Sequence, residues 1–164
     1  MKRILTLALA ALLLLSGCGK SNTTNEGGDN AVTAAVTLGE VTLTVGETFT
    51  AQQKTALGAP ASVEEAPSCH YEGMDTVYKY NGFSIQTYRK DSADAVAVVS
   101  IESAAYPTAK GIKVGDTLEA VRTAYGEAAE STNYYRVYNL TDKVTLTFEF
   151  DGDKVAVILY EEKA

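Results

Sequence analysis

Cysteine, histidine and tryptophan are scarce in this chain. Its 164 residues include two cysteines, one histidine and no tryptophan. Because Cys18 lies in a signal-like segment, the remaining domain holds only Cys69 and can form no disulfide of its own, so its fold must depend on a hydrophobic core. His70 follows Cys69 directly, and an extended backbone turns such neighbours to opposite faces, which makes a Cys–His nucleophile pair geometrically poor.

The patterns of common catalytic and metal sites are absent as well. His70 would need two further metal ligands from distant carboxylates, and no spacing in the sequence suggests them. The sequence contains no glycine-rich phosphate loop, no Gly-x-Ser-x-Gly and no His-Glu-x-x-His. We therefore expect a protein that is not an enzyme and holds no metal or cofactor. The enzymatic alternative is a glycosidase-like carboxylate pair drawn from Glu64-Glu65, Asp91 with Asp94, Asp151 with Asp153, or Glu161-Glu162.

Positive charge is in the minority, and the only long apolar run lies at the N-terminus. The chain has 14 Lys and Arg against 21 Asp and Glu, a net charge of −7. Loss of residues 1–17 would remove two of the basic residues and none of the acidic ones, which leaves 12 against 21 and a net charge of −9. A surface of this sign repels nucleic acid and anionic headgroups, so we expect no nucleic-acid binding and no membrane contact through a basic patch.

The N-terminal segment has the three parts of a secretory signal peptide. Lys2 and Arg3 precede an apolar run over residues 4–15, which is too short for a membrane-spanning helix of about 20 residues, and small residues follow. Leu15-Ser16-Gly17-Cys18 resembles the lipobox of bacterial lipoproteins. The resemblance implies a signal peptide over residues 1–17 and acylation of Cys18, which would anchor the protein on the extracytoplasmic face of the cell membrane. An ordinary signal peptide with an incidental cysteine is the alternative.

The rest of the chain divides into a tether and one domain. Residues 18–35 are rich in Gly, Asn, Thr and Ser without apolar period, the composition of a flexible linker, and residues 36–164 have the length of a single domain. Within that domain, residues 45–49 (VGETF) return at an offset of 69 residues as 114–118 (VGDTL), and each copy leads into a short helical pattern closed by a glycine. We predict a helix over about 49–57 and a second one ending at Gly126. The capping-box pairs are Thr50 with Gln53, and Asp116 with Glu119.

Alternating apolar and polar residues predict three strands after each helix. The predicted strands cover 76–80, 83–88 and 95–102, then 134–138, 144–150 and 155–161, with short strands over 36–45 and 112–114 ahead of the helices. Asn81-Gly82 indicates a type I′ hairpin, and Asp151-Gly152-Asp153 indicates a turn. The alternation of apolar and polar residues in 144–150 predicts a sheet with one buried and one solvent-exposed face, with both helices on the buried face. The predicted fold is α+β, with tandem α-β-β-β repeats over about 36–102 and 111–161 forming an antiparallel sheet.

The second helical motif carries a resemblance to a known family. Gly115-Asp116-Thr117-Leu118 through Tyr125-Gly126 resembles the start of a repeat in β-lactamase-inhibitor-like proteins and small outer-membrane assembly lipoproteins, and in uncharacterised lipoproteins of Gram-positive bacteria. The resemblance covers residues 45–160 as a pattern. It implies a helix closed by aromatic-Gly and followed by a meander of strands. Inhibitors of that family carry disulfides that this chain lacks.

Tyrosine is unusually abundant in this chain, which contains ten of them. Several fall at alternating positions of predicted strands, and the candidate ligand-binding residues are Tyr78, Tyr80, Tyr134, Arg136 and Tyr138. These rings either pack in the core and at the sheet edges or line an open recognition face. Tyrosine is suited to recognition because its ring brings a large contact area and loses little conformational entropy on binding.

Three classes of function follow. A tethered, non-catalytic binding or inhibitory module for a protein or cell-envelope ligand agrees best with the expected anchor, linker and sheet. A structural or assembly role in the envelope is the second class, and an enzyme is the third.

Cys69 is expected to be a buried, neutral thiol, because no Lys or Arg lies within five residues to stabilise a thiolate. Redox pairing of Cys69 with another chain is the alternative.

Overall fold

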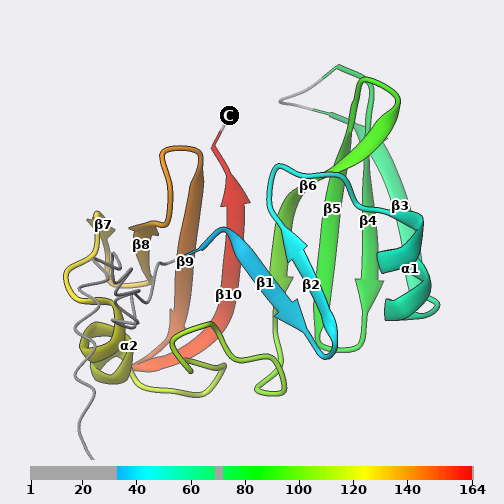
Figure 1. Ribbon diagram of the computed structural model, residues 1–164. Coiled ribbons are helices and arrows are strands. Elements are labelled where there is room, and N and C mark those ends of the chain that lie inside the picture. The colour runs from blue at the N-terminus through cyan, green and yellow to red at the C-terminus, as the bar shows by residue number, and fades with distance from the viewer. Residues whose placement is uncertain (1–32, 69–71, 164) are drawn as a thin grey trace, which may run out of the picture.

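The computed structural model describes residues 33–68 and 72–163, which contain ten strands and two short helices (Figure 1). The strands are β1 (Ala35–Leu38), β2 (Val41–Thr44), β3 (Ser62–Pro67), β4 (Met74–Tyr80), β5 (Phe83–Lys90), β6 (Ala93–Ile101), β7 (Glu130–Ser131), β8 (Tyr135–Asn139), β9 (Val144–Asp151) and β10 (Lys154–Glu162). The helices are α1 (Ala51–Leu57) and α2 (Leu118–Tyr125). The predicted signal peptide, Cys18, most of the tether, Cys69 and His70 lie outside the described residues.

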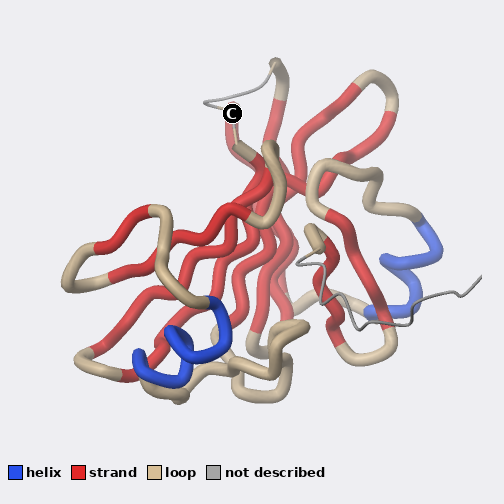
Figure 2. The backbone as a smooth tube through the Cα atoms, turned by 60° about the vertical axis from the view of Figure 1, so that its left-hand side comes forward, coloured by secondary structure: helices blue, strands red, loops and turns tan. Residues whose placement is uncertain are grey.

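Eight strands form one antiparallel sheet in the order β3-β4-β5-β6-β10-β9-β8-β7, and β1 and β2 form a separate hairpin. Both helices and this hairpin lie over the same face of the sheet (Figures 1 and 2). The α+β class with helices on one side is therefore confirmed. In the part of the chain that the structure describes, no helix covers the opposite face.

The hydrophobic core lies between the sheet and the elements that cover it. Phe148 and Ile85 of the sheet are fully buried, as are Leu43 of the β1–β2 hairpin and Val121 of α2, and Phe49 packs in from the turn before α1. These residues are members of one cluster that extends across the sheet from β5 to β8. A continuous apolar core of this kind explains how the domain can fold without a disulfide.

The helix starts agree with the sequence prediction at α1 and correct it at α2. Thr50 and Gln53 form the predicted capping box: each side chain accepts a hydrogen bond from the backbone N–H of the other. At α2 the N-cap is Thr117, whose hydroxyl accepts from the N–H of Ala120 at 3.1 Å, so the prediction of Asp116 was wrong by one residue. Asp116 instead accepts from the N–H of Lys113, because a bridge between Thr117 and Lys154 fixes the start of the helix.

Four details of the predicted strands were wrong. Residues 36–45 form two strands rather than one, because Gly39 takes a positive φ of 65° and turns the chain back. Residues 112–114 form no strand. The edge strands β3 and β7 were missed, since every residue in them is exposed and they show no apolar alternation. At Asn81-Gly82 only the glycine has a positive φ, which is the requirement of a type II turn rather than type I′.

The segments that lead into the two helices make matching backbone contacts with the sheet. Ahead of α1, the N–H of Gly46 donates to Val96 and that of Phe49 donates to Asp94, both at 2.7 Å. Ahead of α2, the N–H of Gly115 donates to Val155 at 2.8 Å, and that of Leu118 donates to Asp153 at 2.9 Å. Each helix therefore starts from a short segment held against the first residues of β6 or β10.

Candidate functional site

Three of the four predicted tyrosines lie on the covered face of the sheet. Tyr78 meets Phe49 edge-on with ring centroids 5.4 Å apart, and Tyr80 stacks on Phe83 at 4.7 Å. Tyr138 is buried, and its ring contacts Tyr125 and Phe148. These three tyrosines pack against the core, which agrees with the first of the two interpretations drawn from the sequence. They do not line the open face of the sheet.

The other two predicted residues differ from these tyrosines in exposure. Tyr134 is 74% exposed, just before β8, and contacts the sheet through its backbone carbonyl, which accepts from the N–H of Phe150. Arg136 is half-buried on β8, with its guanidinium 5.9 Å from the ring of Phe150. Arg136 and Tyr138 both line one cleft, and their assignment as ligand-binding residues stays a prediction.

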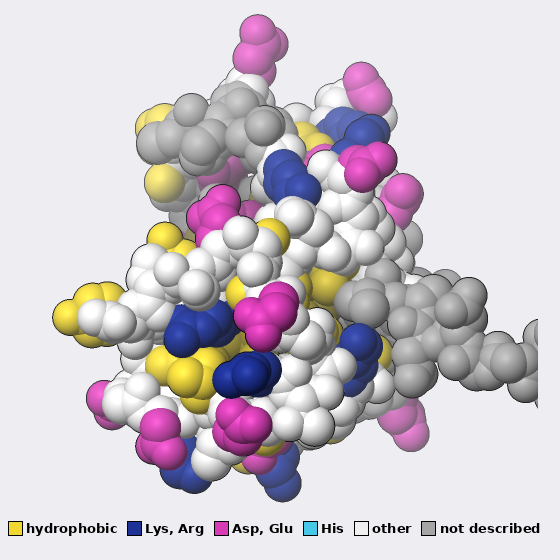
Figure 3. All heavy atoms as spheres, turned by 90° about the vertical axis from the view of Figure 1, so that its left-hand side faces the viewer, with side chains coloured by type: hydrophobic (Ala, Val, Ile, Leu, Met, Phe, Trp, Pro, Cys, Tyr) yellow, Lys and Arg dark blue, Asp and Glu magenta, His cyan; other side chains and the backbone are white. Residues whose placement is uncertain are grey.

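This cleft, which we call the α2–β8 cleft, has a volume of about 330 Å³ and lies between α2, the turn after it, β7 and β8. Charged side chains and apolar surface alternate on this face of the molecule (Figure 3). The cleft is lined by Leu118, Glu119, Arg122, Gly126, Glu127, Ala128, Ser131, Arg136 and Tyr138. Its volume is similar to those of two further clefts, of about 300 and 370 Å³.

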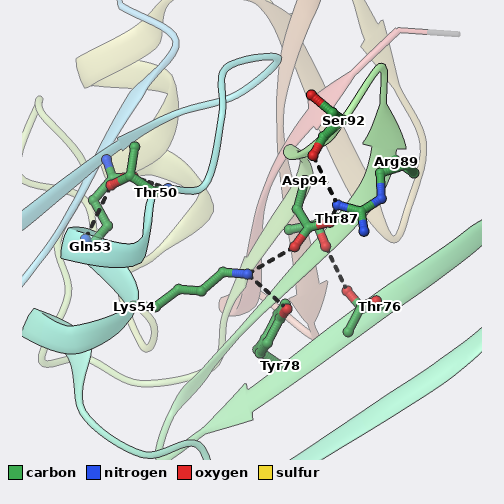
Figure 4. Close-up of polar contacts among 9 residues, drawn as sticks. All are labelled: Thr50, Gln53, Lys54, Thr76, Tyr78, Thr87, Arg89, Ser92 and Asp94. Carbon is green, nitrogen blue, oxygen red and sulfur yellow. Dashed lines mark hydrogen bonds and ion pairs between the residues drawn. The ribbon is translucent and has the colours of Figure 1, made fainter.

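A second polar cluster lies beneath α1 (Figure 4). The ammonium group of Lys54 donates to the hydroxyl of Tyr78 at 3.0 Å and to the carboxylate of Asp94 at 2.9 Å. Arg89 donates to the other oxygen of Asp94 at 2.9 Å. Asp94 thus joins two cations from different elements, and the cluster ties α1 to β4, β5 and β6. Its carboxylate has no second acid facing it in these contacts, so we interpret the cluster as structural.

Several ionisable groups on the covered face have displaced pKa values. Burial raises the pKa of Tyr160 well above its ordinary value, and burial is also the main cause of the raised pKa of Tyr125 and Tyr138. Burial alone would lower the pKa of Lys54, but its hydrogen bonds to Asp94 and Tyr78 outweigh that effect and raise it. All four groups therefore keep their protons in the folded state at pH values where the unfolded chain would release them.

We expect the free energy of unfolding to fall as the pH rises above about 10, where unfolded tyrosine and lysine lose their protons. The sign follows because the folded state then binds more protons than the unfolded state. Urea unfolding followed at several pH values between about 8 and 11.5 measures the slope. The substitution Tyr160→Phe should make the slope shallower, and stability that stays constant across this range would contradict the assignment.

The uncovered side of the sheet, which we call the helix-free face, has few charges at its centre. Side chains on it alternate with core residues along each strand, and directly paired residues form rows across the sheet. One row consists of Lys79, Ser84, Ser100, Leu159, Thr147 and Val137. The next consists of Val77, Gln86, Val98, Glu161, Thr145 and Asn139. The centre therefore combines hydroxyl groups with short apolar side chains, and most of these residues are half-buried.

Among residues 33–68 and 72–163 there is no group of three or more His, Cys, Asp or Glu side chains placed to hold a metal ion. Neither helix in this part of the chain is long and apolar enough to cross a membrane. Of the paired acidic residues named above, Glu65 and Asp94 line one further cleft, which also contains Tyr78 and Arg89. Glu64 instead forms an ion pair with Lys79 at 2.7 Å.

Comparison with known proteins gives little further information. No family model matches the chain, and no curated protein matches it. Among solved structures, the chain is similar to the crystal structure of the uncharacterized protein YfeY from Escherichia coli, with 12% sequence identity and a TM-score of 0.46. The similarity covers 73% of this chain and 93% of that chain.

Proposed function

We propose that this protein is a membrane-anchored, extracytoplasmic lipoprotein whose domain is a non-catalytic binding module for a protein or cell-envelope ligand. The observation that carries the proposal is the helix-free face. No helix covers it in the described chain, and hydroxyl and short apolar side chains surround Ser100 and Leu159, with the exposed carboxylate of Glu161 in the neighbouring row. A face of this composition offers both hydrogen-bonding groups and apolar area to a partner.

The N-terminal sequence supports the location. The lipobox-like segment ending at Cys18 provides the lipid, and the polar composition of residues 18–35 provides a flexible connection between that lipid and the domain. A binding domain on a flexible tether can reach ligands near the membrane surface. An inhibitory role in the manner implied by the family resemblance is one form of this function.

We also propose that the domain consists of two related halves. The matching contacts ahead of α1 and α2 support this relation. So do the irregularities of the sheet: one extra residue, Ala97, bulges from β6 opposite β5, and one extra residue, Ala156, bulges from β10 opposite β9. Ala97 and Ala156 are 59 residues apart, as are Ser100 and Leu159, which pair with each other where β6 meets β10. With β3 and β7 included, each repeat unit becomes α-β-β-β-β.

A structural or assembly role in the envelope is the second candidate. The exposed edge strand β3 supports it, because its outer backbone groups are available to another chain. However, Glu64, Glu65 and Pro67 lie in β3, and charges and proline at an edge disfavour strand pairing. We therefore rank assembly through this edge below binding through the helix-free face.

The test is cross-linking of the full lipoprotein in the cells that produce it. We expect a chemical cross-linker to trap the wild-type protein with a discrete partner. The substitution Ser100→Arg should reduce that product about ten-fold or more, because it places a long charged side chain in the middle of the face. The matched control is Gln52→Arg, which adds the same side chain at an exposed position of α1.

Thermal unfolding of both variants measures whether the fold survives, because Ser100 is half-buried whereas Gln52 is exposed. A product that survives Ser100→Arg undiminished would contradict binding through the helix-free face. Equal loss with Gln52→Arg would show that added positive charge, rather than the face itself, is responsible.

A further inference from the structure

The α2–β8 cleft contains two guanidinium groups with unused hydrogen-bond donors. The Nη1 group of Arg136 donates to the backbone carbonyls of Thr132 and Tyr135, which holds the side chain in place. Within the described residues, its Nε and Nη2 groups have no hydrogen-bond partner. Arg122, from α2, is 65% exposed and makes one ion pair, from Nε to Glu127 at 3.6 Å. Because five N–H groups form a fixed fork in each arginine, these free donors suit a planar carboxylate.

The charges around the cleft favour a carboxylate over a phosphate. Glu119 and Glu127 line the same cleft as the two arginines, so its formal charge is zero. A doubly charged phosphate would be repelled by both glutamates, whereas a ligand with one carboxylate and one ammonium group finds an opposite charge for each. Glu127 is 91% exposed and held by the single ion pair with Arg122, so its carboxylate can turn toward a ligand at small cost.

Apolar side chains form part of the cleft wall. Tyr138 is buried beneath it, with its hydroxyl donating to the carbonyl of Gly126 at 3.3 Å, so the ring rather than the hydroxyl is offered to a ligand. Leu118 and Ala128 complete the apolar lining. A volume of about 330 Å³ lies at the small end of the range for ligand pockets, which suits a compact molecule with one apolar side chain.

We propose that the α2–β8 cleft binds a small zwitterion, either a free amino acid or a dipeptide. The carboxylate meets Arg136 and Arg122, the ammonium group meets Glu119 or Glu127, and an aliphatic side chain rests on Tyr138 and Leu118. This site is separate from the helix-free face, because its residues belong to α2 and to the covered side of β8. It therefore adds a small-molecule ligand to a module proposed above to bind a larger partner.

Isothermal titration of the purified chain with L-leucine and L-leucyl-L-leucine tests the proposal. We expect at least one of them to bind in the range up to about 10 mM. For the one that binds, the analogue with its carboxylate converted to an amide should bind at least ten-fold more weakly, because it removes the charge that meets the arginines. Inorganic phosphate should bind more weakly than the amino acid.

Substitutions separate this site from the rest of the surface. Arg136→Gln and Arg122→Gln should each weaken binding at least ten-fold, and Arg122 is exposed enough that its loss leaves the fold unchanged. The matched control is Arg89→Gln, which removes an exposed arginine from β5 and should leave the affinity unchanged. Equal binding of the amide or of phosphate, no binding of either probe, or unaltered affinity in both cleft variants would overturn the proposal, whatever the cross-linking experiment on the helix-free face gives.

Discussion

Replacing Cys18 with alanine is expected to abolish incorporation of labelled palmitate into this protein. The thiol of Cys18 is the atom to which the lipid would be attached, so its removal leaves no acceptor in the lipobox-like segment. The effect on anchoring should also be large, because each buried CH₂ of an acyl chain contributes about 0.8 kcal/mol and several chains together hold a protein on a membrane. Cells grown with the labelled fatty acid, followed by gel separation, measure the first effect directly.

The matched control is Cys69→Ala, which removes the other cysteine of the chain and leaves the lipobox-like segment intact. This variant should incorporate the label as the wild type does and stay in the membrane fraction. Labelling that persists in Cys18→Ala, together with unchanged membrane retention, would show that the lipoprotein assignment is incorrect. Labelling that is lost in Cys69→Ala but kept in Cys18→Ala would identify Cys69 as the modified thiol.

Gly82→Ala is expected to lower the free energy of unfolding by about 2–5 kcal/mol. Gly82 has a φ of 85°, where an alanine is strained by about 1–2 kcal/mol. A Cβ atom built there would lie 2.5 Å from the Cβ of Ser103, far inside van der Waals contact, and overpacking of this kind costs about 1–3 kcal/mol more. The backbone cannot easily yield, because the carbonyl of Gly82 accepts from the N–H of Glu102 at 2.9 Å. Urea unfolding measures the loss.

A second glycine separates the two causes of this loss. Gly39 has a φ of 65° in the β1–β2 turn, and a Cβ there meets nothing within 4 Å. Gly39→Ala should therefore show the strain alone, about 1–2 kcal/mol. The double substitution Gly82→Ala with Ser103→Gly removes the clash and should recover part of the stability. Equal losses at Gly82 and Gly39 would mean that the loop near Ser103 moves aside freely.

Much of the central sheet could be predicted from the sequence, because apolar and polar side chains alternate along its strands. Val144, Leu146, Phe148 and Phe150 are all buried, and Thr145, Thr147 and Glu149 between them are not. The same alternation located β4, β5, β6, β8 and β10 to within one or two residues at most ends. Short-range capping chemistry also located the start of α1, because Thr50 and Gln53 form their capping box with each other, although Gln53 also donates to the carbonyl of Thr42.

The missed features depend on contacts that no local pattern encodes. β3 and β7 are strands only because β4 and β8 offer them free edges, and their own exposed residues carry no apolar period. The covered position of Tyr78 and Tyr138 depends on α1 and α2, which come from elsewhere in the chain. The α2–β8 cleft joins Arg122 to Arg136, and only the packing of α2 beside β8 reveals that they share one cavity.

The meeting of β6 and β10 has a consequence for the history of such a domain. The two strands are antiparallel, and their pairs are arranged evenly around Ser100 and Leu159: Ile101 lies opposite Ile158 on one side, and Val99 lies opposite Tyr160 on the other. This is the geometry of a two-fold contact between identical chains. A polypeptide of half this length could therefore build the same eight-stranded sheet as a homodimer. Gene duplication and fusion of such a dimer would then free each half to diverge, so that one could keep an ion-pair cluster beneath its helix and the other an open cleft.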